Sequence, residues 1–172
     1  NSYRTFESFG GTSAAHHATV NLSTRESNDT ALVAARNWCR DTGGRVTFSG
    51  RKYAFEATFT AHSYTNFLGS GMDHTHLVWP TGKHAITCQD GDGDSSYGIM
   101  LAHLRITNET WNHGQSEANA SQYSAINIIG RNNGPNDAEA YAREDVAYLS
   151  DPYHRFFFVS VNEFDGNGIS LA

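Results

Sequence analysis

The sequence predicts an all-β fold, a coiled β solenoid with one α-helix at its N-terminal end. Short apolar segments of strand length recur between turns from residue 59 onward. Two-residue hairpin turns are scarce between these segments, which favours a solenoid over a sheet of hairpins. An amphipathic helix pattern precedes the first strands, the position at which a solenoid requires a cap. A β-sandwich with regular hairpin spacing is the competing fold.

The helix is predicted to begin at Ser27 or Asn28, either of which suits an N-cap, with Asp29 favoured in the first turn by the helix dipole. Gly43 and Gly44 mark its end. At about 100° per residue its apolar positions fall on one stripe. The stripe consists of Ala31, Leu32, Ala35, Trp38 and Cys39. We expect this stripe to pack on the strands that follow.

The strands are predicted from a period of two, which places alternate side chains on one face. Two early sets are Val46 with Phe48, and Tyr53 with Phe55, Ala57 and Phe59. Three later sets are Met100, Ala102, Leu104 and Ile106, then Ile126 and Ile128, then Phe157, Val159 and Val161. Each set is expected to face the core.

Composition bounds the class of protein. A chain of 172 residues with 38% hydrophobic and 17% charged residues is long enough for one domain with a substantial core. The formal net charge of −6 and the scattered Lys and Arg argue against nucleic-acid binding. Cys39 and Cys88 are predicted to be buried free thiols. No apolar run approaches the ~18 residues that span a bilayer, so we expect no membrane insertion.

Three segments resemble the pectate-lyase-like superfamily of right-handed parallel β-helices. They are NDTALVAARNWCRDTGGRVTFSGRKYAF at residues 28–55, NFLGSGMDHTHLVW at 66–79 and GIMLAHLRITN at 98–108. The first is similar to that superfamily's helix, Gly-Gly and strand sequence, most like the β-helix entrance of phage tailspikes and polysaccharide depolymerases.

The resemblance implies a right-handed parallel β-helix with an N-terminal capping helix. Residues 1–26 would form an extension, residues 27–59 the capping helix and first strands, and residues 60–172 the rungs with their insertions. We expect the β-helix to continue beyond the C-terminus in the intact protein.

The resemblance also implies a function, that of a phage tailspike-like protein which binds and depolymerises bacterial surface polysaccharide. Such a protein would be a homotrimer located in the virion tail. One alternative is a secreted, monomeric polysaccharide lyase or glycoside hydrolase of the same fold. Another is a structural or receptor-binding virion module without catalysis.

Glu163 and Asp165 are the predicted catalytic pair. Residues two apart in a strand lie on one face about 6.5 to 7 Å apart, within the range of about 5 to 9.5 Å that separates the two carboxyl groups of glycosidases. The alternative is that both carboxylates satisfy backbone amides of a turn.

Four residues of two insertions are predicted to bind glycan, because aromatic rings pack on sugar faces and carboxylates bond to hydroxyls. They are Trp111, Glu117, Tyr123 and Tyr148. Packing of these aromatic side chains onto the body of the protein is the alternative.

No cofactor is predicted. The loop Asp90–Asp94 places alternate aspartates as a calcium loop does, but Ser95 and Leu101 occupy positions at which an EF-hand needs Gly and Glu. We interpret the loop as a solvated turn, and a Ca²⁺ site is the alternative. His16 and His17 lack the spacing to carboxylates or thiols that a metal site needs, and we interpret them as solvated side chains.

Overall fold

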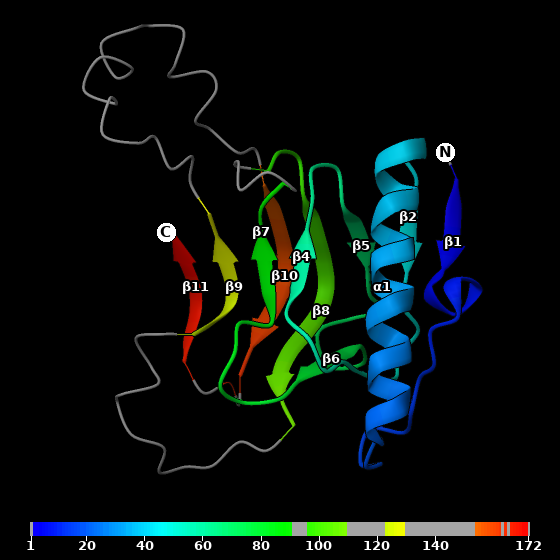
Figure 1. Ribbon diagram of the computed structural model, residues 1–172, viewed down its shortest axis with the longest axis vertical. Helices are drawn as coiled ribbons and strands as arrows, with labels where there is room; N and C mark the ends of the chain where they lie inside the picture. Colours follow the sequence, from blue (N-terminus) through cyan, green and yellow to red (C-terminus); the bar gives the residue numbers. More distant parts are fainter. Residues whose placement is uncertain are drawn as a thin grey trace, which may run out of the picture.

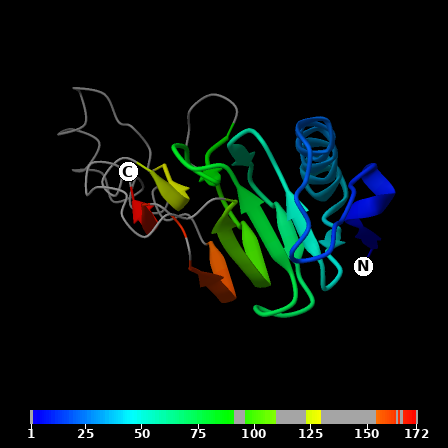
Figure 2. The same cartoon turned by 90° about the horizontal axis from the view of Figure 1, so that it is seen from below.

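A computed structural model describes residues 2–90, 96–109, 123–129, 154–162, 164 and 166–171 (Figure 1). Its elements are β1 (Tyr3–Thr5), the 3-10 helix η1 (Phe6–Phe9), α1 (Leu22–Thr42), β2 (Arg45–Thr47), β3 (Lys52–Ala54), β4 (Phe59–Ala61), β5 (Asn66–Leu68), β6 (His76–Trp79), β7 (Ile86–Cys88), β8 (Met100–Asn108), β9 (Ser124–Ile128), β10 (Arg155–Val161) and β11 (Asn167–Leu171). Strands β1 and β11 lie at opposite ends of the molecule in both views (Figures 1 and 2).

The strands form two parallel sheets. The seven-stranded sheet has the order β1-β2-β5-β8-β6-β3 with β10 also paired to β8, and the four-stranded sheet has the order β11-β9-β7-β4. From β3 onward the chain passes back and forth between them, so that β4, β7, β9 and β11 join one sheet and the remaining strands the other. All pairs between the described strands are parallel, which rules out a hairpin-built sandwich there.

The prediction of an all-β right-handed parallel β-helix is therefore wrong. The protein is an α/β-type mix with 20% helix and 38% strand, and its described residues form two parallel sheets and a single α-helix without a closed helix of strands. The apolar segments were interpreted as successive turns of one coil because a period of two reveals only that a strand has an inner face. It does not reveal which strands become neighbours.

Helix α1 begins earlier than predicted, with its N-cap at Asn21, six residues before Ser27 and seven before Asn28. The side chain of Asn21 caps it by accepting a hydrogen bond from the Thr24 N–H at 2.8 Å. Asn28 is a buried residue inside the helix, and its amide bonds to the backbone of Thr12 and to the Ala54 carbonyl. The helix ends as predicted at Gly43, whose φ of 68° is left-handed and whose N–H donates to the Cys39 carbonyl at 2.8 Å.

The predicted apolar stripe of α1 packs against β2, β3 and β4. Four of its members are fully buried, namely Ala31, Leu32, Ala35 and Cys39. Trp38 is only partly buried, because it lies toward the edge of the stripe and contacts Phe9 with ring centroids 5.7 Å apart. Both cysteines are buried free thiols, as predicted.

Stacked aromatic rings fill the space between the sheets. Phe59 of β4 and Phe67 of β5 join the two sheets with ring centroids 5.6 Å apart. Phe6 of η1 stacks on Phe48 at 4.8 Å, so the segment before α1 belongs to the same core. Pairs of this kind stabilise a core by about 0.5 to 1.5 kcal/mol beyond the burial of their area.

Strand β8 breaks the predicted alternation at His103, whose φ of 55° is left-handed. Leu101 before the break and Leu104 after it both belong to the hydrophobic core cluster, while Met100 and Ala102 are outside that cluster, although Ala102 is buried. The neighbouring β10 breaks at Phe158 in the same way, with a φ of 51°, so Phe157 is exposed although Val159 packs on the core. The period-two prediction thus fails in both strands at one place.

The buried hydroxyl of Tyr53 yields a prediction for stability at high pH. It donates a hydrogen bond to Glu7 Oε1 at 2.6 Å, and burial, followed by that bond, raises the pKa of Tyr53 to about 12. The folded protein favours the neutral hydroxyl of Tyr53, whose pKa in the unfolded chain is about 10. The stabilisation that this hydroxyl contributes is therefore complete below pH 10 and is lost as the pH rises toward 12. We expect the free energy of unfolding to fall by about 2 to 3 kcal/mol more in the wild type than in Tyr53→Phe between pH 10 and 12. Parallel pH dependences in urea melts of the two proteins would contradict the assignment.

Candidate functional site

Most of the site residues predicted from the sequence lie outside the described residues. These are Glu163, Asp165, Trp111, Glu117 and Tyr148. The structure describes Tyr123, whose ring contacts His84 edge to face at 5.8 Å and whose carbonyl accepts a hydrogen bond from the Asn167 N–H at 2.9 Å. The hydrogen bond ties the start of β9 to β11, and the ring contact ties it to the residues before β7.

A polar cavity of about 150 Å³ on the outer face of the seven-stranded sheet is the best candidate site. We call it the sheet-face cleft, and its lining consists of His16, Lys52, His76, Val78, Arg105, Thr107, Asn108 and Glu109. Strands β3, β6 and β8 supply six of these residues, Glu109 directly follows β8, and His16 comes from the segment before α1. Segments far apart in the sequence therefore meet here.

The strand register arranges four polar side chains in one row across this face. Lys52 of β3 pairs with His76 of β6, His76 with Arg105 of β8, and Arg105 with Ser160 of β10. Neighbouring strands lie about 4.8 Å apart, so the row extends over about 14 Å. A second line, Ala54, Val78 and Thr107, runs beside it along three of the strands.

Lys52 fixes one end of the cleft. Its Nζ donates to Glu109 Oε1 and to the Ala18 carbonyl, both at 2.9 Å, and its backbone pairs with that of Ala14. The segment before α1 is thereby attached to β3, the edge strand of the seven-stranded sheet. The side chains of Lys52 and Glu109 are only 11% and 18% exposed, so their charges are largely withdrawn from water and depend on each other.

The two histidines of the cleft are partly buried and contact each other. The rings of His16 and His76 lie 4.5 Å apart, and His16 Nε2 is 2.7 Å from the His74 carbonyl. Burial, followed by the positive charges of Arg105 and His16, lowers the pKa of His76 below its usual value. A neutral His76 donates from Nε2 to the Asp73 carbonyl at 3.3 Å and carries an acceptor on Nδ1.

Two polar atoms of the cleft lack hydrogen-bond partners among the described residues. They are Arg105 Nε, a donor, and Glu109 Oε2, an acceptor. Arg105 Nη2 contacts Asp73 Oδ1 at 2.7 Å, but the Asp73 side chain is 79% exposed, so water competes for this bond. Both unpartnered atoms are shielded in this conformation, and a side-chain rotation has to bring them to a ligand. A buried polar group without a partner costs about 1 to 3 kcal/mol, which a ligand hydroxyl would offset.

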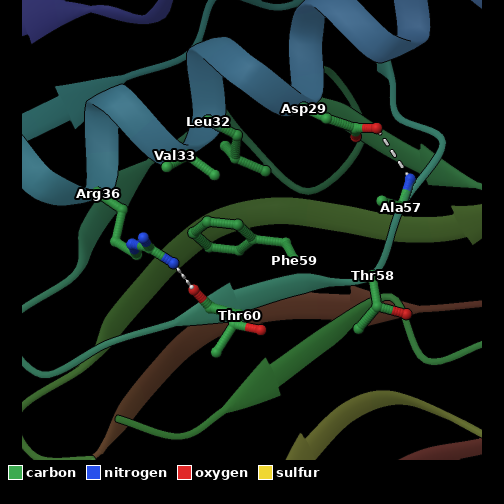
Figure 3. A pocket seen from close by; sticks show the side chains of 8 residues that line it. All are labelled: Asp29, Leu32, Val33, Arg36, Ala57, Thr58, Phe59 and Thr60. Carbon is green, nitrogen blue, oxygen red and sulfur yellow. Dashed lines mark hydrogen bonds between the residues drawn. The ribbon is translucent and has the colours of Figure 1, made fainter. Parts of the chain in front are cut away.

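A second cavity, of about 140 Å³, lies between α1 and β4 (Figure 3). Its polar groups already bind the backbone of the protein. Asp29 at one end accepts from the N–H groups of Glu56 and Ala57, and Arg36 at the other end donates to the Thr60 carbonyl at 2.8 Å. These bonds join the helix to the outer strand of the four-stranded sheet, so we interpret this cavity as structural.

Ser96 and His154 resemble a nucleophile and its base, but the histidine nitrogen that faces the serine carries the proton. His154 Nδ1 accepts from the Ile99 N–H at 3.3 Å, which leaves the proton of the neutral ring on Nε2, 3.5 Å from Ser96 Oγ. Burial lowers the pKa of His154 and favours this neutral form. A base that activates a serine must present an unprotonated nitrogen to it, so this pair does not provide a nucleophile.

Asp90 at the start of the predicted solvated turn has an internal role. Its two carboxylate oxygens accept from the N–H and the hydroxyl of Ser63, both at 2.7 Å, while residues 91–95 lie outside the described residues. In the described parts of the chain no group of three His, Cys, Asp or Glu is placed to hold a metal ion. No helix there is long and apolar enough to cross a membrane.

Comparisons of the chain with protein-family models, with curated proteins and with solved structures find no match. Function therefore has to be inferred from the residues themselves.

The sheet-face cleft was not predicted from the sequence. Its row of polar side chains joins register partners that are 24 to 55 positions apart, and no local sequence pattern relates residues at such distances. The nearest available signal was the basic residue or histidine facing outward on each of β3, β6 and β8.

Breaking the Lys52–Glu109 pair is expected to destabilise the protein. Lys52→Met leaves Glu109 partly buried without its partner, and we expect the free energy of unfolding to fall by about 3 kcal/mol. The double variant Lys52→Met, Glu109→Leu should lose less than the two single variants together, because neither charge is then left unpaired. Arg40→Ala removes an exposed pair with Asp41 and should cost less than about 1 kcal/mol. Additive losses in denaturant melts would show that the two charges do not depend on each other.

Proposed function

We propose that this protein binds a polysaccharide across the outer face of its seven-stranded sheet, with the sheet-face cleft holding one segment of the glycan. The observation that carries the proposal is the row Lys52, His76, Arg105 and Ser160, together with the unpartnered donor and acceptor beside it. A sugar hydroxyl both donates and accepts, so it suits Arg105 Nε and Glu109 Oε2 together.

The shape of the cleft supports a chain-like ligand. Sites that enclose a small molecule usually measure about 300 to 1,000 Å³, larger than the cavity of about 150 Å³ found here. A linear row of polar groups instead suits a ligand that lies along the surface and repeats its hydroxyl groups.

The charges of the cleft support a glycan over a nucleic acid. Glu109 contributes a negative charge to the lining, and the chain carries a formal net charge of −6. Phosphate backbones need clustered, unpaired Lys and Arg, whereas Lys52 is paired with Glu109 and Arg105 with Asp73.

We further propose that the ligand is a bacterial surface polysaccharide and that the protein belongs to a tailspike-like homotrimer of the virion tail. The support for this part is the sequence resemblance at residues 28–55, 66–79 and 98–108. No cofactor is assigned to the binding step, because side-chain hydrogen bonds suffice for it.

The cleft itself supports binding rather than hydrolysis. Glycoside hydrolysis needs two carboxyl groups, and Glu109, the one carboxylate among the described lining residues, is held by Lys52. Depolymerisation therefore rests on Glu163 and Asp165, which lie outside the described residues.

Binding is tested by retention in native gels cast with dextran, alginate or gellan. We expect Arg105→Gln to weaken binding to the retaining polysaccharide about tenfold, since a charged hydrogen-bond donor is lost. Arg40→Gln on α1 makes the same change in net charge away from the cleft and should migrate as the wild type does. The proposal fails if no polysaccharide retards the wild type, or if the two variants behave alike.

Cleavage is tested on the same polysaccharide with Glu163→Gln and Asp165→Asn. If they are the catalytic pair, each variant should lose at least about a hundredfold in rate while gel retention stays unchanged. New reducing ends alone indicate hydrolysis, and added ultraviolet absorbance from an unsaturated product indicates elimination. Undiminished cleavage in both variants would reject the catalytic pair. If the wild type binds the polysaccharide but does not cleave it, the protein is a binding module without catalysis.

A further inference from the structure

His103 of β8 and Phe158 of β10 form an exposed stack of two rings beside the sheet-face cleft. Their ring centroids lie 5.0 Å apart with an angle of 18° between the planes. Both residues adopt left-handed backbone conformations, with φ of 55° and 51°. Phe158 is 63% exposed, so a large apolar ring faces solvent at a kink in the backbone.

The kink has a structural cause in strand pairing. The first half of β8 pairs with β5 and its second half with β6, and these two strands are separated by residues 69–75. The backbone is tight at this bend, because a Cβ on Gly69 would lie 2.2 Å from the His103 carbonyl oxygen. A bend of this kind requires a left-handed residue, but it does not require an aromatic one.

The phenylalanine at the kink is therefore unexpected, whereas the histidine is not. Left-handed backbone is tolerated by Gly and Asn and is also enriched in His, whereas a bulky phenylalanine there is a true outlier under strain. Alternation with Val159 and Val161 places Phe158 on the outer face, where a large apolar ring is exposed to water. Strain and exposure of this kind concentrate at functional sites. A surface role for the stack explains why Phe158 occupies a position that Asn would fill with less strain.

The rings are continuous with the row of polar side chains. Arg105 follows His103 by two residues on β8, and its register partner Ser160 follows Phe158 by two residues on β10. Two residues along a strand cover about 7 Å, so the stack and the row are adjacent on neighbouring strands, which lie side by side in Figure 1.

We propose that the His103–Phe158 stack is a second sugar subsite, on which one ring of the cleft-bound polysaccharide packs through its apolar face. This rests on the proposed function and adds to it a platform for hydrophobic contact. Aromatic side chains present a flat apolar surface, and the C–H groups of a sugar ring fit such a surface. The polar row then binds hydroxyl groups while the stack holds the neighbouring sugar unit.

The proposal predicts that one substitution raises stability and weakens binding. Phe158→Asn relieves the left-handed strain, so its Tm should rise by about 2 to 4 °C. Its affinity for the retaining polysaccharide among dextran, alginate and gellan should fall about tenfold. His103→Asn should also weaken binding but leave the Tm nearly unchanged, because histidine already tolerates left-handed backbone.

Tyr64 provides a matched control elsewhere on the molecule. It is 60% exposed with a φ of 67°, and it lies in the turn between β4 and β5. Tyr64→Asn should raise the Tm to a similar extent without changing the affinity. Phe158→Leu keeps an apolar side chain but removes the ring, so it should weaken binding even if the Asn variant does not fold.

The outcomes separate this proposal from the one on which it rests. If the wild type binds polysaccharide and the Phe158 variants bind equally well, the subsite is wrong and the cleft remains. If no polysaccharide binds the wild type, both proposals fail. If the Phe158 variants lose self-association in light scattering but keep their affinity, the ring serves a contact between protein chains, which also overturns the subsite.

Discussion

The long strand β8 is the element on which the seven-stranded sheet depends. It pairs with β5 and β6 on one side and with β10 on the other, so three strands are placed by its backbone hydrogen bonds. Its inner side chains Leu101, Leu104 and Ile106 are fully buried in the core. Because β8 must match two separate strands, it bends at His103, and its outer face acquires the features from which function is inferred.

The sheet-face cleft follows from this arrangement together with one ion pair. Lys52 joins the segment before α1, the outer strand β3 and Glu109 at the end of β8, which closes one side of the cleft. A lone buried charge there would be costly, so the pair restricts how the lining can rearrange. The neutral His76 and the partly solvated Arg105 then present hydrogen-bonding groups of mixed character to a ligand. This combination suits hydroxyl-rich ligands better than strongly charged ones.

Local features of the fold were predictable from the sequence, and long-range ones were not. The stripe of α1 and its end at Gly43 follow from spacing and turn chemistry. The start of the helix was placed too late because Asn28 has the character of a cap, whereas its amide bonds to Thr12 and Ala54, which are distant in the sequence. The kink at His103 was invisible because it arises from a break in the partner strands, not from a local glycine.

The candidate site likewise depends on long-range features that the sequence did not reveal. An outward Lys52 or Arg105 carries little information alone, since such residues usually lie on a solvated face. Their meaning depends on a register that aligns them with His76, and only the structure supplies it. His16 was interpreted as solvated because its partner in the ring contact, His76, lies sixty positions later.

The central claim is that one continuous outer face, formed around β8, binds a polysaccharide. Amide chemical shifts of the ¹⁵N-labelled protein, titrated with oligosaccharides from the polysaccharide that retains it, test this claim most directly. The account predicts shifts concentrated at His76, Arg105, Thr107 and Glu109 and extending to His103 and Phe158. Shifts confined to α1 and β4, around the cavity of Figure 3, or an unperturbed spectrum at saturating oligosaccharide, would contradict it.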